Sequence, residues 1–263
     1  MDNQAPRSKQ QRQKPQDDFL WFSYFGITKD EASQDRDLRI SRCIKRAYLD
    51  LSRTVRYSIS TTDLERMKSS KSEDDRDQAL SFDRRKQGFL DEVKKDLSTK
   101  IYDLLVANPA NPAEYFEGTD SEGSKSWHKA ACDAIRNKAI RDKANSLEGN
   151  LPLLKPDHQF TYGQAQKWVN MSLKYLYVMG FDDMSHIERV IHVPVDSLII
   201  DAANELGVRW PSTSWSKLDN YSEYLAFQKK LRQKIPDRTE CPLVWENHAW
   251  IELARIHAEK AAR

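Results

Sequence analysis

The stretch FTYGQAQKWVNMSLKYLYVMG, residues 160–180, decides the fold class of this chain. Its apolar residues predict a long, strongly apolar helix that opens at a turn formed by Tyr162 and Gly163. Glycine is scarce, with 8 residues in a chain of 263, and strand-like runs of Val, Ile and Thr are few. Because this composition favours helices over sheets, the sequence predicts an all-α protein.

A second stretch, VIHVPVDSLIIDAANELG at residues 190–207, predicts a shorter helix. Asp196 follows Pro194 closely and is placed to cap a helix over residues 197–206. Gly207 is placed to end that helix. A polar connection at residues 182–189 separates the two stretches.

Further helices are predicted on both sides of these stretches. Apolar residues recur at helical spacing near residues 37–57, 90–105, 221–235 and 245–256. Thr28 and Glu31 have the spacing of a capping box. Residues 127–143 predict a basic helix, whose cations form either a solvated face or a set of phosphate contacts.

The domain organisation follows from composition. Residues 1–18 are polar and mildly basic, which predicts a disordered tail, with a loose phosphate-binding arm as the alternative. The turn-rich segment NLPLLKP, residues 150–156, predicts a boundary between two helical lobes. We expect these lobes at residues 19–150 and 151–263, with part of the first packing on the C-terminal helices. A cleft between the lobes is expected near Tyr162 and Ser197.

Bulk properties exclude several classes of protein. Three scattered cysteines form neither a disulfide framework nor a CxxC zinc pair, and no apolar run approaches the length of a membrane span. No glycine-rich phosphate loop or G-x-S-x-G motif occurs. A metal site among Asp182, Asp183, His186, Glu188 and His192 lacks ligand spacing, so we expect a charged loop there. We expect a monomeric, cytoplasmic protein of bacterial type, used at the nucleoid, without metal or cofactor.

The two stretches resemble the core of the helix-hairpin-helix DNA glycosylase superfamily. In those enzymes a glycine-containing hairpin precedes a lysine on a helix, and an apolar-Pro-Val-Asp motif introduces the next helix. The matching residues are Gly163, Lys167, Asn170, Leu173, Val193, Pro194, Val195 and Asp196, then Leu198, Ile199, Ile200, Leu206 and Gly207. This sequence differs in having one hairpin glycine and a polar insertion between Lys167 and Asp196. It also lacks the four-cysteine loop of some members, so no iron–sulfur cluster is expected.

The resemblance implies excision of a damaged or modified base from double-stranded DNA. Asp196 would stabilise the positive charge that builds on the sugar as the base departs. Lys167, with a neutral amine, could attack C1′ and form a Schiff base, which adds lyase activity. The target is either a repair lesion or a modified cytosine of phage DNA.

The resemblance also implies DNA contacts and a pocket for the flipped base. The expected DNA contacts are Gly163, Gln164 and Gln166 at the helix N-terminus, with Lys129 and Arg136 on the basic helix. A flipped base needs an aromatic-lined pocket. The candidates for that pocket are Trp168, Trp210, Trp215 and Trp245.

An alternative from another class is a non-catalytic helical protein that binds nucleic acid or acts as an adaptor. Such a protein keeps the basic helix and uses Asp196 only as a helix cap. Geometry distinguishes the two hypotheses. A glycosylase needs the Asp196 carboxylate to face an open cleft near Lys167, whereas an adaptor would seal Asp196 from solvent.

Overall fold

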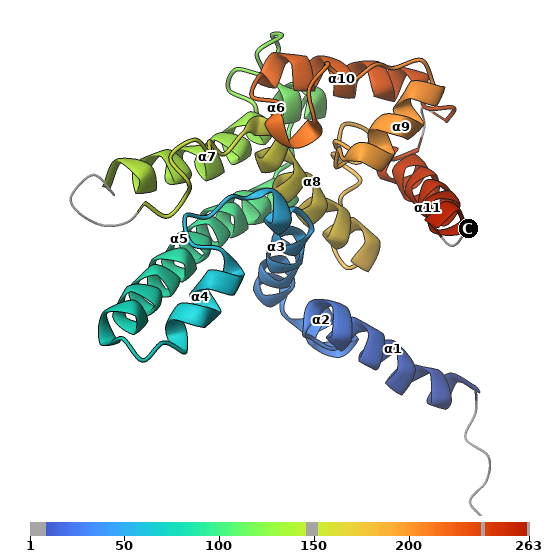
Figure 1. Cartoon of the computed structure of the whole chain (residues 1–263). Helices are drawn as coiled ribbons and strands as arrows, with labels where there is room; N and C mark the ends of the chain where they lie inside the picture. The colour runs from blue at the N-terminus through green and yellow to red at the C-terminus, as the bar shows by residue number, and fades with distance from the viewer. Residues whose placement is uncertain (1–8, 146–151, 238–239, 262–263) are drawn as a thin grey trace, which may run out of the picture.

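The computed structural model describes residues 9–145, 152–237 and 240–261 (Figure 1). In these ranges the chain is helical, with one isolated β-bridge between Tyr57 and Leu154 and no β-strand. The predicted all-α class is therefore confirmed. The helices are α1 (Lys9–Phe25), α2 (Lys29–Gln34), α3 (Arg36–Leu51), η1 (Ser52–Thr54), α4 (Thr61–Lys68), α5 (Glu73–Val106), α6 (Pro112–Glu117), α7 (Trp127–Asn145), α8 (Tyr162–Met179), α9 (Ser197–Glu205), η3 (Trp215–Lys217), α10 (Tyr221–Lys234) and α11 (Pro242–Ala261).

Local capping signals fix several helix ends. The predicted capping box is present, because Thr28 Oγ1 accepts from the Glu31 amide at 3.2 Å while Glu31 accepts from the Thr28 amide at 2.8 Å. Gly207 follows α9 with φ +73°, a conformation that favours glycine and ends the helix as predicted. These ends depend on contacts within a few residues, which is why the sequence alone reveals them.

Other boundaries differ from the sequence-based expectations. Residues 9–18, expected within a disordered tail, form the first part of α1, and residues 1–8 lie outside the described residues. α5 begins at Glu73, much earlier than the predicted residue 90, because Ser72 caps it. α3 ends at Leu51 rather than near residue 57, since the chain turns through η1 and then pairs with the segment that precedes α8.

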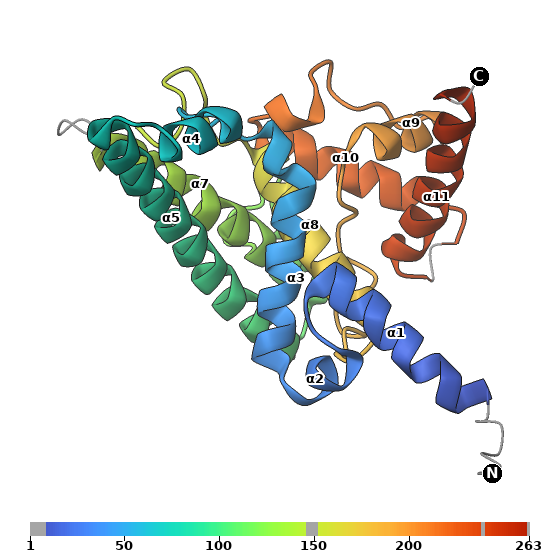
Figure 2. The same cartoon turned by 60° about the horizontal axis from the view of Figure 1, so that its bottom comes forward.

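Helix α8 is the centre of the fold. Its first twelve residues, from Tyr162 to Leu173, are all buried, so both apolar and polar side chains of this segment lie inside the protein. α3 packs along one side of α8 and α7 along another, while α5 contacts both α3 and α7 (Figure 2). A helix buried on every side needs partners for each of its polar side chains. Those partners build the site described below.

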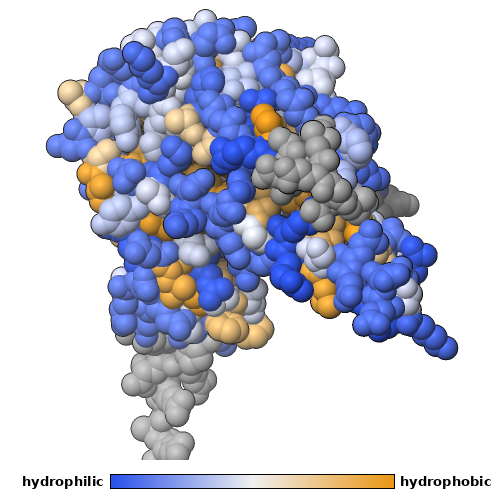
Figure 3. Space-filling view, turned by 90° about the vertical axis from the view of Figure 1, so that its left-hand side faces the viewer, coloured by the Kyte–Doolittle hydropathy of each residue, from blue (hydrophilic) through white to orange (hydrophobic). Residues whose placement is uncertain are grey.

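The hydrophobic core is one continuous cluster. It includes Ile44 of α3, Leu97 of α5, Trp168 of α8 and Leu231 of α10, so residues from both expected lobe ranges share it. α9 and α11 pack against each other, and in Figure 1 they lie on the side of α8 away from α5 and α7. The outer face that Figure 3 shows is mostly hydrophilic, with apolar residues in separate patches. Within the described residues, no helix is both long and apolar enough to cross a membrane.

Candidate active site

Lys167 and Asp196 lie side by side. Lys167 Nζ donates to Asp196 Oδ2 at 2.8 Å, although the polar insertion separates the two residues in sequence. The Lys167 side chain is 6% exposed and that of Asp196 is 19% exposed, so the pair is mostly enclosed but reaches solvent. The expected convergence of these two residues is therefore present in the structure.

Asp196 divides its two carboxylate oxygens between two tasks. Oδ1 accepts from the Ile199 amide at 3.1 Å and caps α9, while Oδ2 accepts from Lys167. The predicted capping role is correct, and it leaves one oxygen for the lysine. A capped helix N-terminus also stabilises negative charge on this carboxylate.

Side-chain amides hold the extended segment that ends at Asp196. Gln166 donates to the Val195 carbonyl at 3.0 Å and accepts from the Val195 amide at 3.2 Å, as a neighbouring strand would. Gln228 of α10 does the same for Val193, at 2.8 and 3.2 Å. Asn170 donates to the Val193 carbonyl at 3.2 Å and to Gln166 Oε1 at 3.0 Å. These three amides fix the direction from which Asp196 approaches Lys167.

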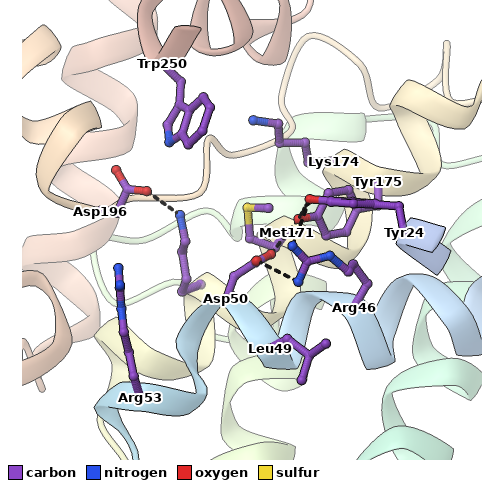
Figure 4. Close-up of a pocket in the computed structure, with 11 residues that line it drawn as sticks. Tyr24, Arg46, Leu49, Asp50, Arg53, Met171, Lys174, Tyr175, Asp196 and Trp250 are labelled. Carbon is purple, nitrogen blue, oxygen red and sulfur yellow. Dashed lines mark hydrogen bonds and ion pairs between the residues drawn. The ribbon is translucent and has the colours of Figure 1, made fainter. Parts of the chain in front are cut away.

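The Lys167–Asp196 pair lies at one end of a cavity of about 430 Å³ (Figure 4). That volume lies within the range of roughly 300–1,000 Å³ typical of small-molecule sites. Figure 4 shows Asp196 and Trp250 on one side, and Arg46 and Leu49 of α3 with Arg53 of η1 across from them. The lining residues are Tyr24, Arg46, Leu49, Asp50, Arg53, Lys167, Met171, Lys174, Tyr175, Asp196 and Trp250.

One wall of the cavity is a hydrogen-bonded group of aromatic and charged side chains. Tyr175 donates to Asp50 at 2.5 Å, and its hydroxyl lies 2.9 Å from that of Tyr24. Arg46 forms an ion pair with Asp50 at 3.0 Å and lies 4.2 Å from the centre of the Tyr24 ring. Burial and the hydrogen bond to Asp50 raise the pKa of Tyr175, so this hydroxyl stays protonated. The wall is therefore rigid, and it presents aromatic surface.

A buried carboxylate lies behind another part of the wall. Glu246 of α11 is 1% exposed and forms an ion pair with Lys174 at 2.6 Å. Burial raises the pKa of Glu246, and the nearby Lys174 opposes that shift. Glu246 thus compensates the charge of Lys174 and attaches α11, with Trp250 one turn further on, to α8.

The four tryptophans expected in the pocket lie elsewhere. Trp168 is fully buried and donates to the Ile44 carbonyl at 3.0 Å. Trp210 is 9% exposed and donates to the Thr213 carbonyl at 3.1 Å. Trp215 and Trp245 are half-buried beside the core, and neither lines the cavity. These side chains pack the interior, and the aromatic residues of the cavity are Tyr24, Tyr175 and Trp250.

The N-terminus of α8 is closed by protein contacts. The Gly163 amide donates to the Leu218 carbonyl at 2.8 Å, and a Cβ on Gly163 would lie 1.7 Å from the Trp215 carbonyl oxygen. The Tyr162 amide donates to Asp219 at 3.3 Å. Gly163 therefore belongs to the first turn of α8 rather than to a preceding turn, and the close approach of η3 accounts for the glycine.

The other expected DNA contacts on α8 are also internal. Gln164 is 1% exposed and donates to the Thr54 carbonyl at 2.8 Å, while Gln166 is fully buried on Val195. Gly163, Gln164 and Gln166 therefore present no free group to a phosphate in this structure. Their hydrogen bonds hold the site together instead.

The two α7 cations expected to contact DNA, Lys129 and Arg136, form contacts within the protein. Lys129 pairs with Asp133 at 2.7 Å, and Arg136 pairs with Asp219 at 2.6 Å and donates to the Phe160 carbonyl at 3.2 Å. Arg136 also lies 3.8 Å from the centre of the Tyr162 ring. Lys129 and Arg136 thus join α7 to the start of α8, and neither lines the cavity.

A buried polar chain extends from Asn170 across the core. His128 Nε2 donates to Asn170 Oδ1 at 2.9 Å, Asn170 donates to Tyr224 Oη at 2.8 Å, and Tyr224 donates to His192 Nδ1 at 2.8 Å. His192 Nε2 then donates to Glu117 at 2.8 Å. Burial lowers the pKa of both histidines, which fits this assignment of neutral rings. The sequence did not reveal this series of hydrogen-bonded side chains, because its members come from four separate helices and the loop before α9.

Asp182, Asp183, His186, Glu188 and His192 form no metal-binding group in the part of the chain that the structure describes. Asp182 pairs with Arg39 at 2.8 Å, and His192 lies in the buried chain away from it. No group of three or more His, Cys, Asp or Glu side chains suited to a metal occurs among the described residues.

The cavity residues that sequence reasoning missed follow a helical spacing. Met171 and Lys174 share one face of α8 with the predicted Lys167, and Arg46, Leu49 and Asp50 of α3 and Arg53 of η1, which follows α3 directly, lie three or four positions apart. Each face mixes charged and apolar residues, and this helical spacing can be read from the sequence alone. Nothing in the sequence pairs these two faces with each other.

The chain was also compared with known proteins. No protein-family model, curated protein or solved structure matches it.

Proposed function

We propose that this protein is a DNA glycosylase and that the cavity holding Lys167 and Asp196 is its active site. The observation that carries the proposal is the 2.8 Å contact between Lys167 Nζ and Asp196 Oδ2 at the edge of a cavity open to solvent. A nucleophile with an acceptor for its proton, next to a space for substrate, is the arrangement that covalent catalysis requires. The resemblance at residues 162–207 supplies the reaction class.

The composition of the cavity supports a nucleotide as ligand. Four cationic side chains and two carboxylates line it, so its walls favour an anion. Trp250, Tyr24 and Tyr175 offer flat surface on which a base can stack. A base that leaves the duplex needs such a surface, because flipping removes its stacking partners. The proposed cleft lies between α3 and α8 on one side and α9 and α11 on the other.

Lys167 and Asp196 have complementary roles in the proposed reaction. Lys167 passes one ammonium proton to Asp196 Oδ2 and attacks C1′ with the lone pair that this frees. The bond from C1′ to the base breaks, its electron pair leaves on the base, and Asp196 delivers the proton to that base. A second nitrogen proton moves to O4′ as the sugar ring opens, which leaves a Schiff base and an ionised Asp196.

The surroundings assist this exchange of protons. Asp196 holds the proton that the departing base needs, and its position in the transition state is set in advance by Gln166 and the cap of α9. The Schiff base is either hydrolysed, which leaves an abasic site, or eliminated, which cuts the strand. The lyase activity is therefore part of the proposal.

The adaptor alternative predicts a different environment for Asp196. In an adaptor this carboxylate would only cap its helix and would be sealed from solvent. Here its second oxygen reaches Lys167, and its side chain lines the cavity. This arrangement favours the enzyme over the adaptor.

Two substrate classes follow from the proposal, a repair lesion and a modified cytosine of phage DNA, both in double-stranded DNA. A panel of duplexes with oxidised, alkylated, deaminated and phage-modified bases tests the function through release of free base. Asp196→Asn should abolish release, and Lys167→Ala should abolish trapping of a DNA–protein adduct by borohydride. The matched controls are Asp91→Asn and Lys94→Ala, which break an ion pair of the same 2.8 Å length on α5. Tight DNA binding without release from any duplex would favour the adaptor.

A further inference from the structure

A second groove adjoins the cavity. It has a volume of about 520 Å³ and shares two lining residues with the cavity, Leu49 of α3 and Arg53 of η1, so the two spaces are neighbours at the end of α3. Its other lining residues come from α3, η1, the segment before α4, the start of α4, α5 and the segment before α8. They are Tyr48, Ser52, Val55, Arg56, Tyr57, Ile59, Ser60, Thr61, Lys86 and Lys155.

The charged residues that line this groove are all cationic. They are Arg53, Arg56, Lys86 and Lys155, and no carboxylate lines the groove. Arg56 pairs with Asp157 outside the lining, and Lys86 Nζ lies 4.4 Å from the centre of the Tyr57 ring. Among the described residues, the side chains of Arg53, Lys86 and Lys155 have no carboxylate at ion-pair distance, although the charge of Lys155 contributes to the lowered pKa of Asp157.

The cavity differs from the groove in this respect. Three of the four cations of the cavity have a carboxylate partner: Lys167 with Asp196, Arg46 with Asp50, and Lys174 with Glu246. The fourth cation is Arg53, which the cavity shares with the groove. Uncompensated positive charge is therefore concentrated in the groove.

Backbone hydrogen bonds hold together the two chain segments that carry Arg56 and Lys155. The Ser58 amide donates to the Leu153 carbonyl at 2.9 Å, and the Lys155 amide donates to the Arg56 carbonyl at 3.0 Å. These bonds join the segment after η1 to the segment before α8, and α4 packs on α5 beside them (Figure 2). The groove is thus built from chain segments held together before any ligand binds.

We propose that this groove binds the phosphodiester backbone of DNA beside the nucleotide that enters the cavity. The inference rests on the proposed function, and it assigns the phosphates to a surface outside the motif at residues 162–207. When one nucleotide of a strand lies in the cavity, the nucleotides bonded to it must lie close to the cavity. The groove is the space that adjoins the cavity. Unpaired lysines and arginines bind phosphate without reading sequence, and they release counterions as they do so.

Lys86 and Lys155 test the groove separately from the cavity, because neither lines the cavity. The probe is a fluorescein-labelled duplex with one stable abasic-site analogue, and binding is measured by anisotropy over a range of salt concentrations. Lys86→Ala/Lys155→Ala should weaken binding roughly tenfold at low salt and reduce the slope of log K against log salt by about 2. The control, Lys230→Ala/Lys234→Ala, removes two exposed lysines of α10, which lies away from α4 (Figure 1).

The outcomes separate this inference from the proposed function. Loss of affinity and slope in the groove variant, with a normal melting temperature and an unaffected control, supports the groove even if no base is released. Unchanged affinity and slope in the groove variant would overturn it, including when wild type releases base. An equal loss in the control variant would also overturn it, since general charge would then explain the binding. The charge-reversed variant Lys86→Glu/Lys155→Glu is a second test in the same assay, and it should bind the duplex more weakly than the alanine variant does.

Discussion

The side-chain amide of Gln166 pairs with both backbone groups of Val195, at 3.0 Å to its carbonyl and 3.2 Å to its amide. One turn of α8 thereby carries both the lysine of the site and the group that positions the aspartate. Lys167 and Asp196 are thus fixed relative to each other by their immediate chain neighbours. Their contact is a property of the buried framework and does not depend on two flexible side chains meeting by chance.

Gln166→Ala should therefore damage the site as well as the fold. It leaves two buried backbone groups of Val195 without partners, which costs about 2–3 kcal/mol of unfolding free energy. A shift of Asp196 should also slow base release by roughly 10²-fold, because small misplacements of reacting groups are costly. Urea unfolding and single-turnover base release measure the two effects. Gln164→Ala, which loses its bonds to Thr54, should destabilise the protein while the rate for the folded fraction stays near wild type.

Gly163→Ala tests the assignment of that glycine to packing. A Cβ would lie 1.7 Å from the Trp215 carbonyl oxygen, so the backbone of η3 or of α8 must move. We expect a loss of at least about 2–3 kcal/mol in unfolding free energy. The control is Gly88→Ala in α5, where a Cβ meets nothing within 4 Å and should stabilise the helix by about 0.5–1 kcal/mol. Equal stability of the two variants would contradict the packing role.

Glu117→Gln tests the buried polar chain through pH. Burial opposes ionisation of Glu117, but the hydrogen bonds from His192 and Arg232 and the charge of Arg232 outweigh it and hold the pKa of Glu117 at about 2, below the ordinary 4.5. A carboxylate with a lowered pKa stabilises the fold above pH 4.5 and loses that contribution as the pH falls towards 2. Wild type should exceed the variant by at most about 3 kcal/mol near neutral pH, since one pKa unit is worth about 1.4 kcal/mol.

The measurement for Glu117 is urea unfolding at a series of pH values. The difference between wild type and Glu117→Gln should close as the pH falls from 4.5 towards 2. Glu252→Gln, at an exposed position on α11, serves as the control and should show no comparable pH-dependent difference. A constant difference across this range would mean that Glu117 acts through packing and not through its charge.

Trp250→Ala tests whether the cavity stacks a base. Trp250 is 40% exposed, so its removal should change the melting temperature little. Stacking of a base on an aromatic ring is worth about 1–3 kcal/mol, so we expect roughly 5- to 150-fold weaker binding of substrate DNA. Ile251→Ala removes a 45% exposed neighbour that does not line the cavity and should leave binding unchanged. Equal effects of the two substitutions would exclude a specific role for Trp250.

The sequence predicts those parts of the fold that depend on local chemistry. The cap at Asp196 and the glycine after α9 are set by neighbouring residues, and both are confirmed. The meeting of Lys167 with Asp196 was an expectation taken from the resemblance in the order of the two motifs. It did not require knowledge of the rest of the fold.

The remaining parts of the site depend on tertiary contacts. Trp250 reaches the cavity because Glu246, one turn earlier on α11, pairs with Lys174 of α8. Gly163 is required by η3, which lies far along the chain. Gln166 reads as a surface residue in sequence, yet it is fully buried against Val195. Composition and spacing do not reveal such pairings, so the sequence did not show that Gln164 and Gln166 are internal or that the four expected tryptophans lie outside the cavity.

The most direct test of the central claim is the single-turnover rate of base release by Asp196→Asn on a duplex that wild type cleaves. The substitution keeps the size of the side chain and an oxygen that can cap α9, but it removes the charge and the proton acceptor next to Lys167. We expect release to fall at least about 10²-fold while the melting temperature changes little and Asp91→Asn retains the wild-type rate. Release by Asp196→Asn at the wild-type rate would contradict the account.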